Sequence, residues 1–485
     1  MQRDKKTSPP PEYKTTVNVR GIIFRWMPLL VALCVLAEGL YFITATKPGH
    51  IPDIWSHVYR VDAVTNGDII ARPVTSKSML HNTDTGVVGG AVDRAWMEYS
   101  LANYDGYDPN IVLPDSIRDK HSPTVDLPFN NAAINNPVAY LPQIAGFAIG
   151  KALGLSCGTT YRIAEIMMLI VYVLMMFCAI RALPRWRIPI GLLLCLPLMV
   201  SRASFAISAD SFTQAVTLLF SCLLIRGFIG KRSVRGTMQL AALGLVLSMV
   251  KFTYVPLVLL MIPLIFDSES MPDTERSAAT PASGNIKQLR ISRQRAIPVF
   301  SSIALSGVCT MLWLSANSWY TTTPMIVSYA EMSERKHMLL THPNFLAKAI
   351  GDIYYAVIHA QSNMNSRAQS LIIAACWFAI IIVLMAMIAA TVTTAKRHMH
   401  RQVTHFTMKA LPLPCSWLIW LICTGIIVLT YLALWLQYTT GDIGVEGVQY
   451  RYFLPLAALF GFVLLESLMR IAAPIARPAA KPSEK

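Results

Sequence analysis

Two carboxylates and two cations stand where apolar runs of the sequence begin, end or break. Asp53 follows the first apolar run closely, Asp210 lies in a short turn between two runs, Lys251 lies at a break, and Arg451 begins the last run. Ionisable groups at the edge of an apolar run are costly to place, which makes them functional candidates. A carboxylate there can act as general base on a hydroxyl group, and a nearby guanidinium can bind a phosphate.

Each of these residues also has a purely structural explanation. Asp210 can be the N-cap of a helix that starts at Ser211. Arg451 and Lys251 can be anchors whose charged ends reach the membrane surface. Asp53 can be an ordinary turn residue. Sequence alone leaves these alternatives open.

Two further polar residues follow the first carboxylate at helical spacing. His57 and Arg60 come four and seven residues after Asp53, which on a helix puts all three side chains on one side. They are candidate substrate-binding residues. Asp53, His57 and Asp210 also form a conceivable site for a divalent cation, Mg²⁺ or Mn²⁺. That set is not specific, so we assign no metal ligand and no definite cofactor.

The elements that position these residues are membrane helices. Of the 485 residues, 54% are hydrophobic and only 14% are charged, and several runs reach the roughly 20 apolar residues that cross a bilayer. One such run can be a signal peptide, but so many cannot. The nine cysteines form no C-x-x-C pair, which argues against a metal cluster or a disulfide framework.

A net charge of +15 can indicate a protein that binds nucleic acid, but the distribution of the basic residues argues against this. Lys and Arg gather in short stretches between the apolar runs, at about 3–25, 181–187, 226–235, 276–295, 396–409 and 470–485. Short basic loops of this kind lie on the cytoplasmic side of a membrane. We therefore expect a multi-pass protein of the cytoplasmic membrane with both termini inside, and no nucleic-acid partner.

We predict an all-α transmembrane bundle of about ten crossings within a membrane domain at 26–472. Basic cytoplasmic tails at 1–25 and 473–485 flank it, and a disordered cytoplasmic linker occupies 267–296. Extracytoplasmic loops are expected at 47–135, which has eleven acidic and seven basic residues, and at 317–368. The predicted crossings are 26–46, 162–182, 188–205, 211–229, two short helices within 237–266, 297–316, 370–392, 413–437 and 451–471. The stretch 137–155 is expected to lie at the outer surface.

The order of these segments resembles a bacterial family of predicted membrane proteins of unknown function that neighbours the GT-C glycosyltransferases. Pro52, Asp53, His57 and Arg60 are similar to its P-D-E-x-x-H-x-x-R-A motif, and 136–143 is similar to its S-P-x-x-Y-L-P-Q stretch. Further matches are 208–210, 251–256 and 447–455, the last resembling G-V-Q-G-R-Y-x-x-P. The resemblance covers about residues 26–472.

This resemblance implies a GT-C-like architecture and a sugar donor carried on a polyprenyl phosphate. By that analogy Asp53 is the base, Asp210 a supporting acid, and Arg451 with Lys251 the phosphate-binding cations. The matched positions Tyr254 and Gln449 join the substrate-binding set. Two departures are Ile54, where the family commonly has Glu, and Tyr450, where it commonly has Gly. The first removes a second acid and lowers the case for a metal.

We therefore predict a membrane glycosyltransferase that moves a sugar from a polyprenyl phosphate to an extracytoplasmic cell-envelope glycan or glycolipid. One alternative is a transporter or flippase of a lipid-linked glycan, favoured by the break near Lys251 and Pro256. Another is a non-catalytic membrane component of envelope polysaccharide assembly, favoured by Ile54.

Overall fold

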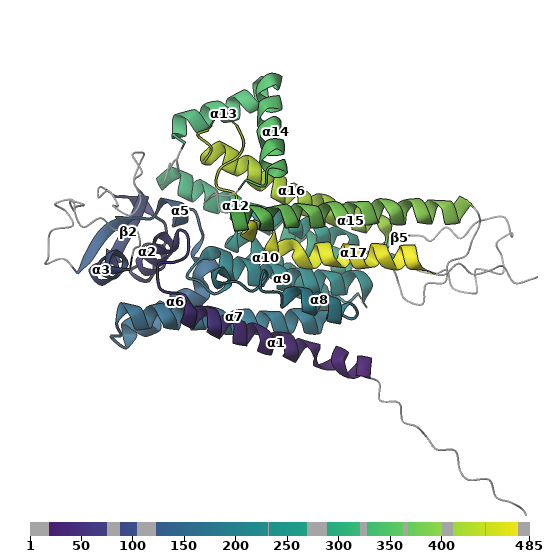
Figure 1. Cartoon of the computed structure of the whole chain (residues 1–485), viewed down its shortest axis with the longest axis horizontal. Coiled ribbons are helices and arrows are strands. Elements are labelled where there is room, and N and C mark those ends of the chain that lie inside the picture. Colours follow the sequence, from purple (N-terminus) through teal and green to yellow (C-terminus); the bar gives the residue numbers. More distant parts are fainter. Residues whose placement is uncertain are drawn as a thin grey trace, which may run out of the picture.

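A computed structural model describes residues 19–74, 88–103, 123–230, 232–268, 289–320, 327–361, 367–399, 411–441 and 443–473. Within these ranges the chain is mostly helical, and seven helices are long and apolar enough to cross a membrane. They are α1 (Val19–Ala45), α7 (Cys157–Ala182), α9 (Ala209–Ile229), α12 (Arg293–Tyr320), α15 (Arg367–Met399), α16 (Leu413–Gln437) and the segment Tyr450–Ala472, which comprises η4 (Tyr450–Tyr452), η5 (Leu454–Leu456) and α17 (Ala457–Ala472). Figure 1 shows these helices running roughly along one axis.

The predicted break near Lys251 separates two shorter apolar helices. α10 (Val234–Val250) ends at Lys251, and η3 (Phe252–Ile265) follows it as a 3₁₀ helix. At about 2.0 Å per residue, a 3₁₀ helix of this length extends roughly 28 Å. Pro256 and Pro263 lie inside η3. α10, η3 and α12 pack together in the bundle.

The continuous crossing predicted at 188–205 is not seen. α8 (Arg187–Leu194) has only eight residues, and a single turn, η2 (Arg202–Ser204), precedes α9. Pro197 follows the end of α8 and lacks the N–H that a continuing helix needs. The segment between α7 and α9 is therefore a broken helix.

The stretch 137–155 forms η1 (Pro137–Tyr140) and α6 (Leu141–Ala152), which is too short to be among the seven long helices. α6 packs closely along α7 because Gly146 and Gly150 leave room for the neighbouring backbone. A Cβ atom at Gly150 would lie 2.2 Å from Thr160 Oγ1, and one at Gly146 would lie 2.5 Å from Ala164 Cα. Small residues at such spacing allow close helix contacts in membranes.

The described residues of the loop predicted at 47–135 form a small domain at one end of the bundle (Figure 1). It contains α2 (Ile54–Thr65), α3 (Arg94–Ala102), α5 (Asn130–Ala133) and an antiparallel sheet in the order β1 (Arg72–Pro73), β2 (Val88–Asp93), β3 (Thr124–Pro128). Gly89 pairs with Arg72 on one side and with Pro128 on the other. Lys151 of α6 ties this domain to the bundle through Asp62 at 2.8 Å.

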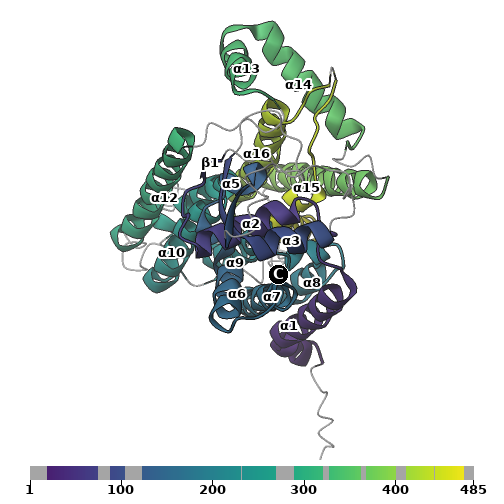
Figure 2. The same cartoon turned by 90° about the vertical axis from the view of Figure 1, so that its left-hand side faces the viewer.

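The second predicted loop, 317–368, contains a helical hairpin. α13 (Tyr329–Thr341) and α14 (Pro343–Ile358) pack against each other and against the end of α16. Trp435 of α16 donates a hydrogen bond of 2.9 Å to Asp352 of α14. Viewed along the bundle in Figure 2, the hairpin projects from one side of the helices.

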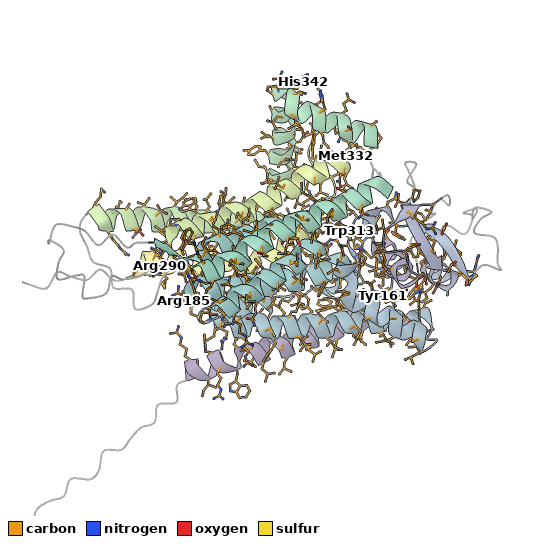
Figure 3. All side chains as sticks on the ribbon, turned by 180° about the vertical axis from the view of Figure 1, so that it is seen from behind. Tyr161, Arg185, Arg290, Trp313, Met332 and His342 are labelled. Carbon is orange, nitrogen blue, oxygen red and sulfur yellow. The ribbon has the colours of Figure 1, made fainter. Side chains whose placement is uncertain are left out.

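The opposite end of the bundle carries basic side chains around one buried carboxylate. Glu466 of α17 is fully buried, pairs with Arg185, and accepts hydrogen bonds from Trp186 Nε1 at 2.6 Å and Leu411 N at 3.0 Å. β4 (Phe266–Ser268) and β5 (Leu289–Ile291) pair nearby, and most of the linker predicted at 267–296 lies outside the described residues. Figure 3 shows Arg185 and Arg290 at this end, far from Tyr161 at the start of α7.

Candidate functional site

The two carboxylates predicted from sequence meet at Arg451. Its Nε lies 3.0 Å from Asp210 Oδ2, and its Nη2 lies 3.7 Å from Asp53 Oδ2. Lys251 Nζ pairs with the other oxygen of Asp210. These four residues come from the start of α2, the first turn of α9, the break after α10, and η4. We call them the charge cluster; its two negative and two positive charges balance.

Asp53 occupies a backbone conformation that most residues avoid. Its φ of 62° and ψ of 8° lie in the left-handed region, which Asp tolerates better than most non-glycine residues. Asp53 is at the N-cap position of α2, yet its side chain does not cap the helix. Instead its carboxylate accepts a hydrogen bond of 3.0 Å from Asn131 Nδ2 and faces Arg451. With 32% of its side chain exposed, Asp53 is the most accessible member of the charge cluster.

Asp210 is not the N-cap of α9. Ser208 holds that position, and its hydroxyl accepts a hydrogen bond of 3.2 Å from the Asp210 backbone N–H. The Asp210 carboxylate is therefore available to Lys251 and Arg451. A negative charge in the first turn of a helix is also favoured by the helix dipole. The interpretation of Asp210 as the N-cap is wrong, because Ser208 caps the helix.

Tyr452 and Tyr254 hold the two cations in place. The ring centroid of Tyr452 lies 5.3 Å from Lys251 Nζ and 6.0 Å from Arg451 Cζ, within range of a cation–π interaction. Tyr254 of η3 is buried, and its hydroxyl donates a hydrogen bond of 3.1 Å to the Tyr452 carbonyl. Tyr254 thus fixes the η4 turn that carries Arg451.

His57 lies one helical turn into α2, behind Asp53. It is buried, and a hydrogen bond of 2.6 Å joins its Nδ1 to the hydroxyl of Tyr140. Burial lowers the pKa of His57 to about 4, although the charges of Asp210 and Asp53 oppose this shift. Burial likewise raises the pKa of Tyr140. Both groups are therefore uncharged at neutral pH, and the pair can orient the site without adding charge.

Arg60 and Gln449, which were also predicted as site residues, do not belong to the charge cluster. Arg60 is fully buried, and its guanidinium donates to the backbone carbonyls of Asp68 at 3.0 Å and Ile69 at 2.6 Å. These bonds hold the end of α2 to the segment that leads into the sheet. Gln449 is buried at the N-cap position of η4, directly before Tyr450. Both lie on segments that also carry members of the cluster.

Three polar residues around the cluster were not predicted as site residues. Asn131 binds Asp53, Tyr140 binds His57, and Gln143 of α6 donates to the carbonyls of Ala206 and Ser208 at 3.2 Å each. Gln143 therefore fixes the turn that presents Asp210. Tyr140 and Gln143 lie in the stretch 136–143 that is similar to the S-P-x-x-Y-L-P-Q motif, and that similarity was the available signal for them.

The donor set does not suit a divalent cation. Among the described residues, no group of three or more His, Cys, Asp or Glu side chains is arranged to hold a metal ion. Both cluster carboxylates face cations of the protein, and the Nδ1 of His57 is engaged by Tyr140. These side chains are therefore engaged by cations and a tyrosine of the protein itself, an arrangement that does not fit a divalent cation.

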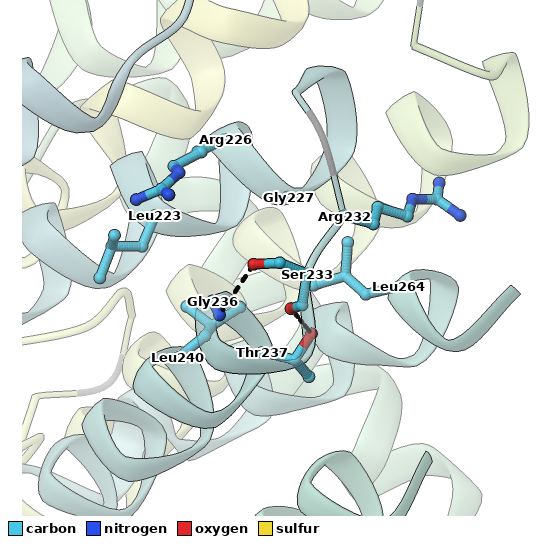
Figure 4. Close-up of a pocket in the computed structure, with 9 residues that line it drawn as sticks. All are labelled: Leu223, Arg226, Gly227, Arg232, Ser233, Gly236, Thr237, Leu240 and Leu264. Carbon is cyan, nitrogen blue, oxygen red and sulfur yellow. Dashed lines mark hydrogen bonds between the residues drawn. The ribbon is translucent and has the colours of Figure 1, made fainter. Parts of the chain in front are cut away.

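Two cavities lie elsewhere in the described structure. One, between α9 and α10, holds only about 20 Å³, and Figure 4 shows its Arg226 and Arg232 side chains directed away from one another. The other, about 410 Å³, lies between α13, α14 and the end of α16. Trp435, Thr439 and Lys348 are among its lining residues.

The larger cavity adjoins the charge cluster along the chain. Thr439 lines this cavity, and its Oγ1 accepts a hydrogen bond of 3.1 Å from the backbone N–H of Glu446, in the segment that leads to Arg451. Asp352 of α14 accepts hydrogen bonds from Trp435 Nε1 at 2.9 Å and from Gly444 N at 3.4 Å. The hairpin, the end of α16 and the segment leading to Arg451 are thus joined to one another.

The order of the motifs, now seen to converge on one cluster, agrees with the comparison to known families. Residues 36–460 match the family described as predicted membrane protein, DUF2142. The chain belongs to this family. The match to DUF2142 begins inside α1 and ends inside α17, so it includes every residue of the charge cluster. No curated protein and no solved structure matches the chain.

Proposed function

We propose that this DUF2142 protein transfers a sugar from a polyprenyl-phosphate donor to a hydroxyl group of a cell-envelope glycan or glycolipid. The observation that carries the proposal is the charge cluster. At the end of a membrane bundle it places a partly exposed carboxylate, Asp53, 3.7 Å from Arg451, and Arg451 shares Asp210 with the second cation, Lys251. A base and phosphate-binding cations within a few ångströms of each other are what a single displacement on a sugar phosphate requires.

In the proposed reaction Asp53 takes the proton of the acceptor hydroxyl as the acceptor oxygen attacks the anomeric carbon of the donor. The bond between that carbon and the phosphate oxygen breaks, and the polyprenyl phosphate leaves with the electron pair. Arg451 and Lys251 then hold the additional negative charge of the leaving phosphate. Asp210, which contacts both cations, keeps them in place before the donor arrives.

The left-handed backbone of Asp53 supports its assignment as the base. Unusual backbone conformations cost energy and persist where the surrounding structure imposes them, often at functional sites. Here the conformation turns the carboxylate away from its own helix and toward Asn131 and Arg451. A plain turn residue has no need of either contact.

We propose a GT-C-like bundle of ten passes with the charge cluster outside and both termini inside. Three passes would be added to the seven long helices by the broken segment 187–208, by α10 and by η3. The distribution of basic residues between the two ends of the bundle supports this orientation. Arg185, Arg290 and Arg397 gather at the end opposite the small acidic domain, as expected for the cytoplasmic side.

Transport of a lipid-linked glycan is the second candidate function. The break between α10 and η3 favours it, because interrupted helices often line the binding sites of transporters. However, Lys251, the residue at this break, forms an ion pair with Asp210 in the charge cluster. A transporter would move labelled lipid-linked glycan across proteoliposome membranes without forming a new glycosidic bond.

The deciding experiment compares Asp53→Asn with Asp126→Asn in membranes supplied with a panel of radiolabelled polyprenyl-phosphate sugars. Asn tolerates the left-handed backbone and keeps the shape of the side chain, so Asp53→Asn removes the base and the negative charge that faces Arg451 without a demand on the backbone. Asp126 lies in the same outer domain and pairs with Arg72, which makes it a matched control. We expect loss of transfer with Asp53→Asn and wild-type transfer with Asp126→Asn.

Full transfer by Asp53→Asn would overturn the proposed mechanism. A cell that keeps its surface glycan with the Asp53 variant but loses it on deletion would indicate the non-catalytic component instead, in keeping with Ile54. Loss of transfer in both variants would point to a fold defect in the outer domain, which thermal unfolding of the purified proteins detects.

A further inference from the structure

The helix α14 has three distinct faces. Ala349, Asp352 and Ala356 are buried, on the face that meets α16 through the Trp435–Asp352 hydrogen bond. A second face is polar and carries Asn344, Lys348, Tyr355 and His359, with Lys348 also lining the larger cavity. The third face is apolar.

The apolar face is exposed along the whole helix. Leu346 is 45% exposed, Ile350 59%, Tyr354 66% and Ile358 57%. These residues recur every four positions, so they form one continuous line on the helix surface. We call them the α14 stripe. Four large apolar side chains left open in a row mark an interaction surface rather than a scatter of single exposed residues.

The orientation of α14 identifies what this surface meets. Figures 1 and 2 show α14 standing across the axis of the bundle, so it lies roughly parallel to the plane of the membrane that the long helices cross. It packs at the outer end of α16, near Trp435. With 16 residues, α14 is about 24 Å long, which is too short to cross a bilayer.

The two helices beside the stripe also expose large apolar side chains. α15 exposes Leu371 at 71% and Phe378 at 65%, and α16 exposes Leu429 at 58%. α14 contacts both of these helices, so its stripe continues their apolar surface at the level where they leave the membrane. A polar face with a lysine, an apolar face opposite, and aromatic rings at the edge are typical of a helix that lies in the interface.

We propose that α14 lies in the outer leaflet at the boundary between headgroups and acyl chains, with its stripe against the acyl chains. This proposal does not depend on sugar transfer. Its consequence for the site is direct. Asp352 of α14 holds Trp435 and Gly444, and Gly444 belongs to the segment that leads to Arg451. The membrane surface thereby fixes the height of that segment and of the cavity that α14 lines.

The test places the photo-crosslinking amino acid p-benzoylphenylalanine at Ile350 or Tyr354 of the full chain, and at Asn344 as the matched control. The protein is reconstituted in nanodiscs of phosphatidylethanolamine and phosphatidylglycerol, irradiated, and examined by mass spectrometry. We expect phospholipid adducts at positions 350 and 354 and no adduct at position 344. Both test positions are well exposed, so the larger ring can be accommodated, and Ile358 provides a third position on the same stripe.

Two results would overturn the proposal. Adducts at 350 and 354 with a second copy of the chain, seen as a covalent dimer, would show that the stripe is a protein interface. Equal lipid adducts at 344, or none at any position, would show that α14 is either fully immersed or clear of the membrane. A thermal unfolding midpoint equal to that of the wild type confirms that each variant is folded before it is scored.

Discussion

The charge cluster predicts an unequal response to removal of its anion and of one of its cations. Asp210 contacts both Arg451 and Lys251, whereas Lys251 contacts Asp210 alone among the cluster carboxylates. Replacing Asp210 with Asn leaves two largely buried cations facing each other, with side-chain exposures of 12% and 19%. Replacing Lys251 with Met leaves Asp210 paired with Arg451.

The sizes of these effects follow from the geometry. At 3.0 Å and an effective dielectric constant of about 20, the attraction between Arg451 and Asp210 is roughly 5 kcal/mol before desolvation is subtracted. Removing one partner of a buried pair typically costs about 3–5 kcal/mol. We therefore expect Asp210→Asn to lower the free energy of unfolding by about 3 kcal/mol, at the lower end because the cluster is partly exposed. Lys251→Met should cost roughly 1.5–2 kcal/mol, the lower part of the range of about 1.5–3 kcal/mol for a hydrogen bond to a charged group, because Asp210 keeps its contact with Arg451.

The assay is equilibrium unfolding in mixed micelles with an increasing fraction of SDS, followed by tryptophan fluorescence. The double variant Asp210→Asn/Lys251→Met should be no less stable than Asp210→Asn, because loss of the lysine relieves the repulsion of Arg451. Residues in one ion-pair network show coupling energies of about 0.5–3 kcal/mol. Equal effects of the two single variants, or a double variant equal to their sum, would refute the reasoning.

Two other predictions concern His57 and the contact between α6 and α7. Because the pKa of His57 is lowered to about 4 from an ordinary value near 6.5, the unfolded chain binds a proton in this range that the folded chain does not. Stability should therefore fall as the pH drops from about 6.5 to 4. In thermal unfolding, His57→Gln should flatten this pH dependence, whereas the exposed control His359→Gln should not. An unchanged pH dependence in His57→Gln would contradict the lowered pKa of His57. Gly150→Leu should lower the thermal midpoint and weaken any activity, because a Cβ at 150 already overlaps Thr160 Oγ1; overpacking of this kind costs about 1–3 kcal/mol or more. A Gly150→Leu protein as stable as the wild type would mean that α6 and α7 are not in close contact.

The sequence predicts the membrane helices and the cluster for one common reason. Hydropathy marks where a helix enters or leaves the bilayer, and a charge at such a point stands out against the apolar run. Asp53, Asp210, Lys251 and Arg451 were all found in this way. Their convergence could be proposed only because each was expected at the same membrane surface, and the structure brings them together.

Features that depend on distant partners could not be predicted. Arg60 is spaced from Asp53 as a helix neighbour, but its donors go to carbonyls that tertiary folding brings near. Ser208 outcompetes Asp210 as the N-cap, a choice that sequence spacing alone does not decide. The apolar run at 188–205 predicts a membrane crossing, yet helix α8 ends at Leu194. Hydropathy reports that a segment is apolar but not that its backbone is continuous.

Asn131 and Gln143 illustrate the same limit within the site. Both are uncharged amides; Gln143 lies in the motif-like stretch 136–143, but nothing along the chain indicates that Asn131 binds Asp53 or that Gln143 binds the turn before Asp210. The α14 stripe is different, because its spacing of four residues can be recognised in the sequence once α14 is known to lie at the protein surface.

The electrical balance of the cluster has a consequence for any anion that enters it. Arg451 divides its guanidinium between two carboxylates, and it is 3.7 Å from Asp53 but 3.0 Å from Asp210. An arriving phosphate oxygen competes first with the more weakly held partner. In the proposed reaction, binding of the donor phosphate would thus separate Asp53 from Arg451 and leave it hydrogen-bonded to Asn131 beside the substrate, where its carboxylate can accept a proton.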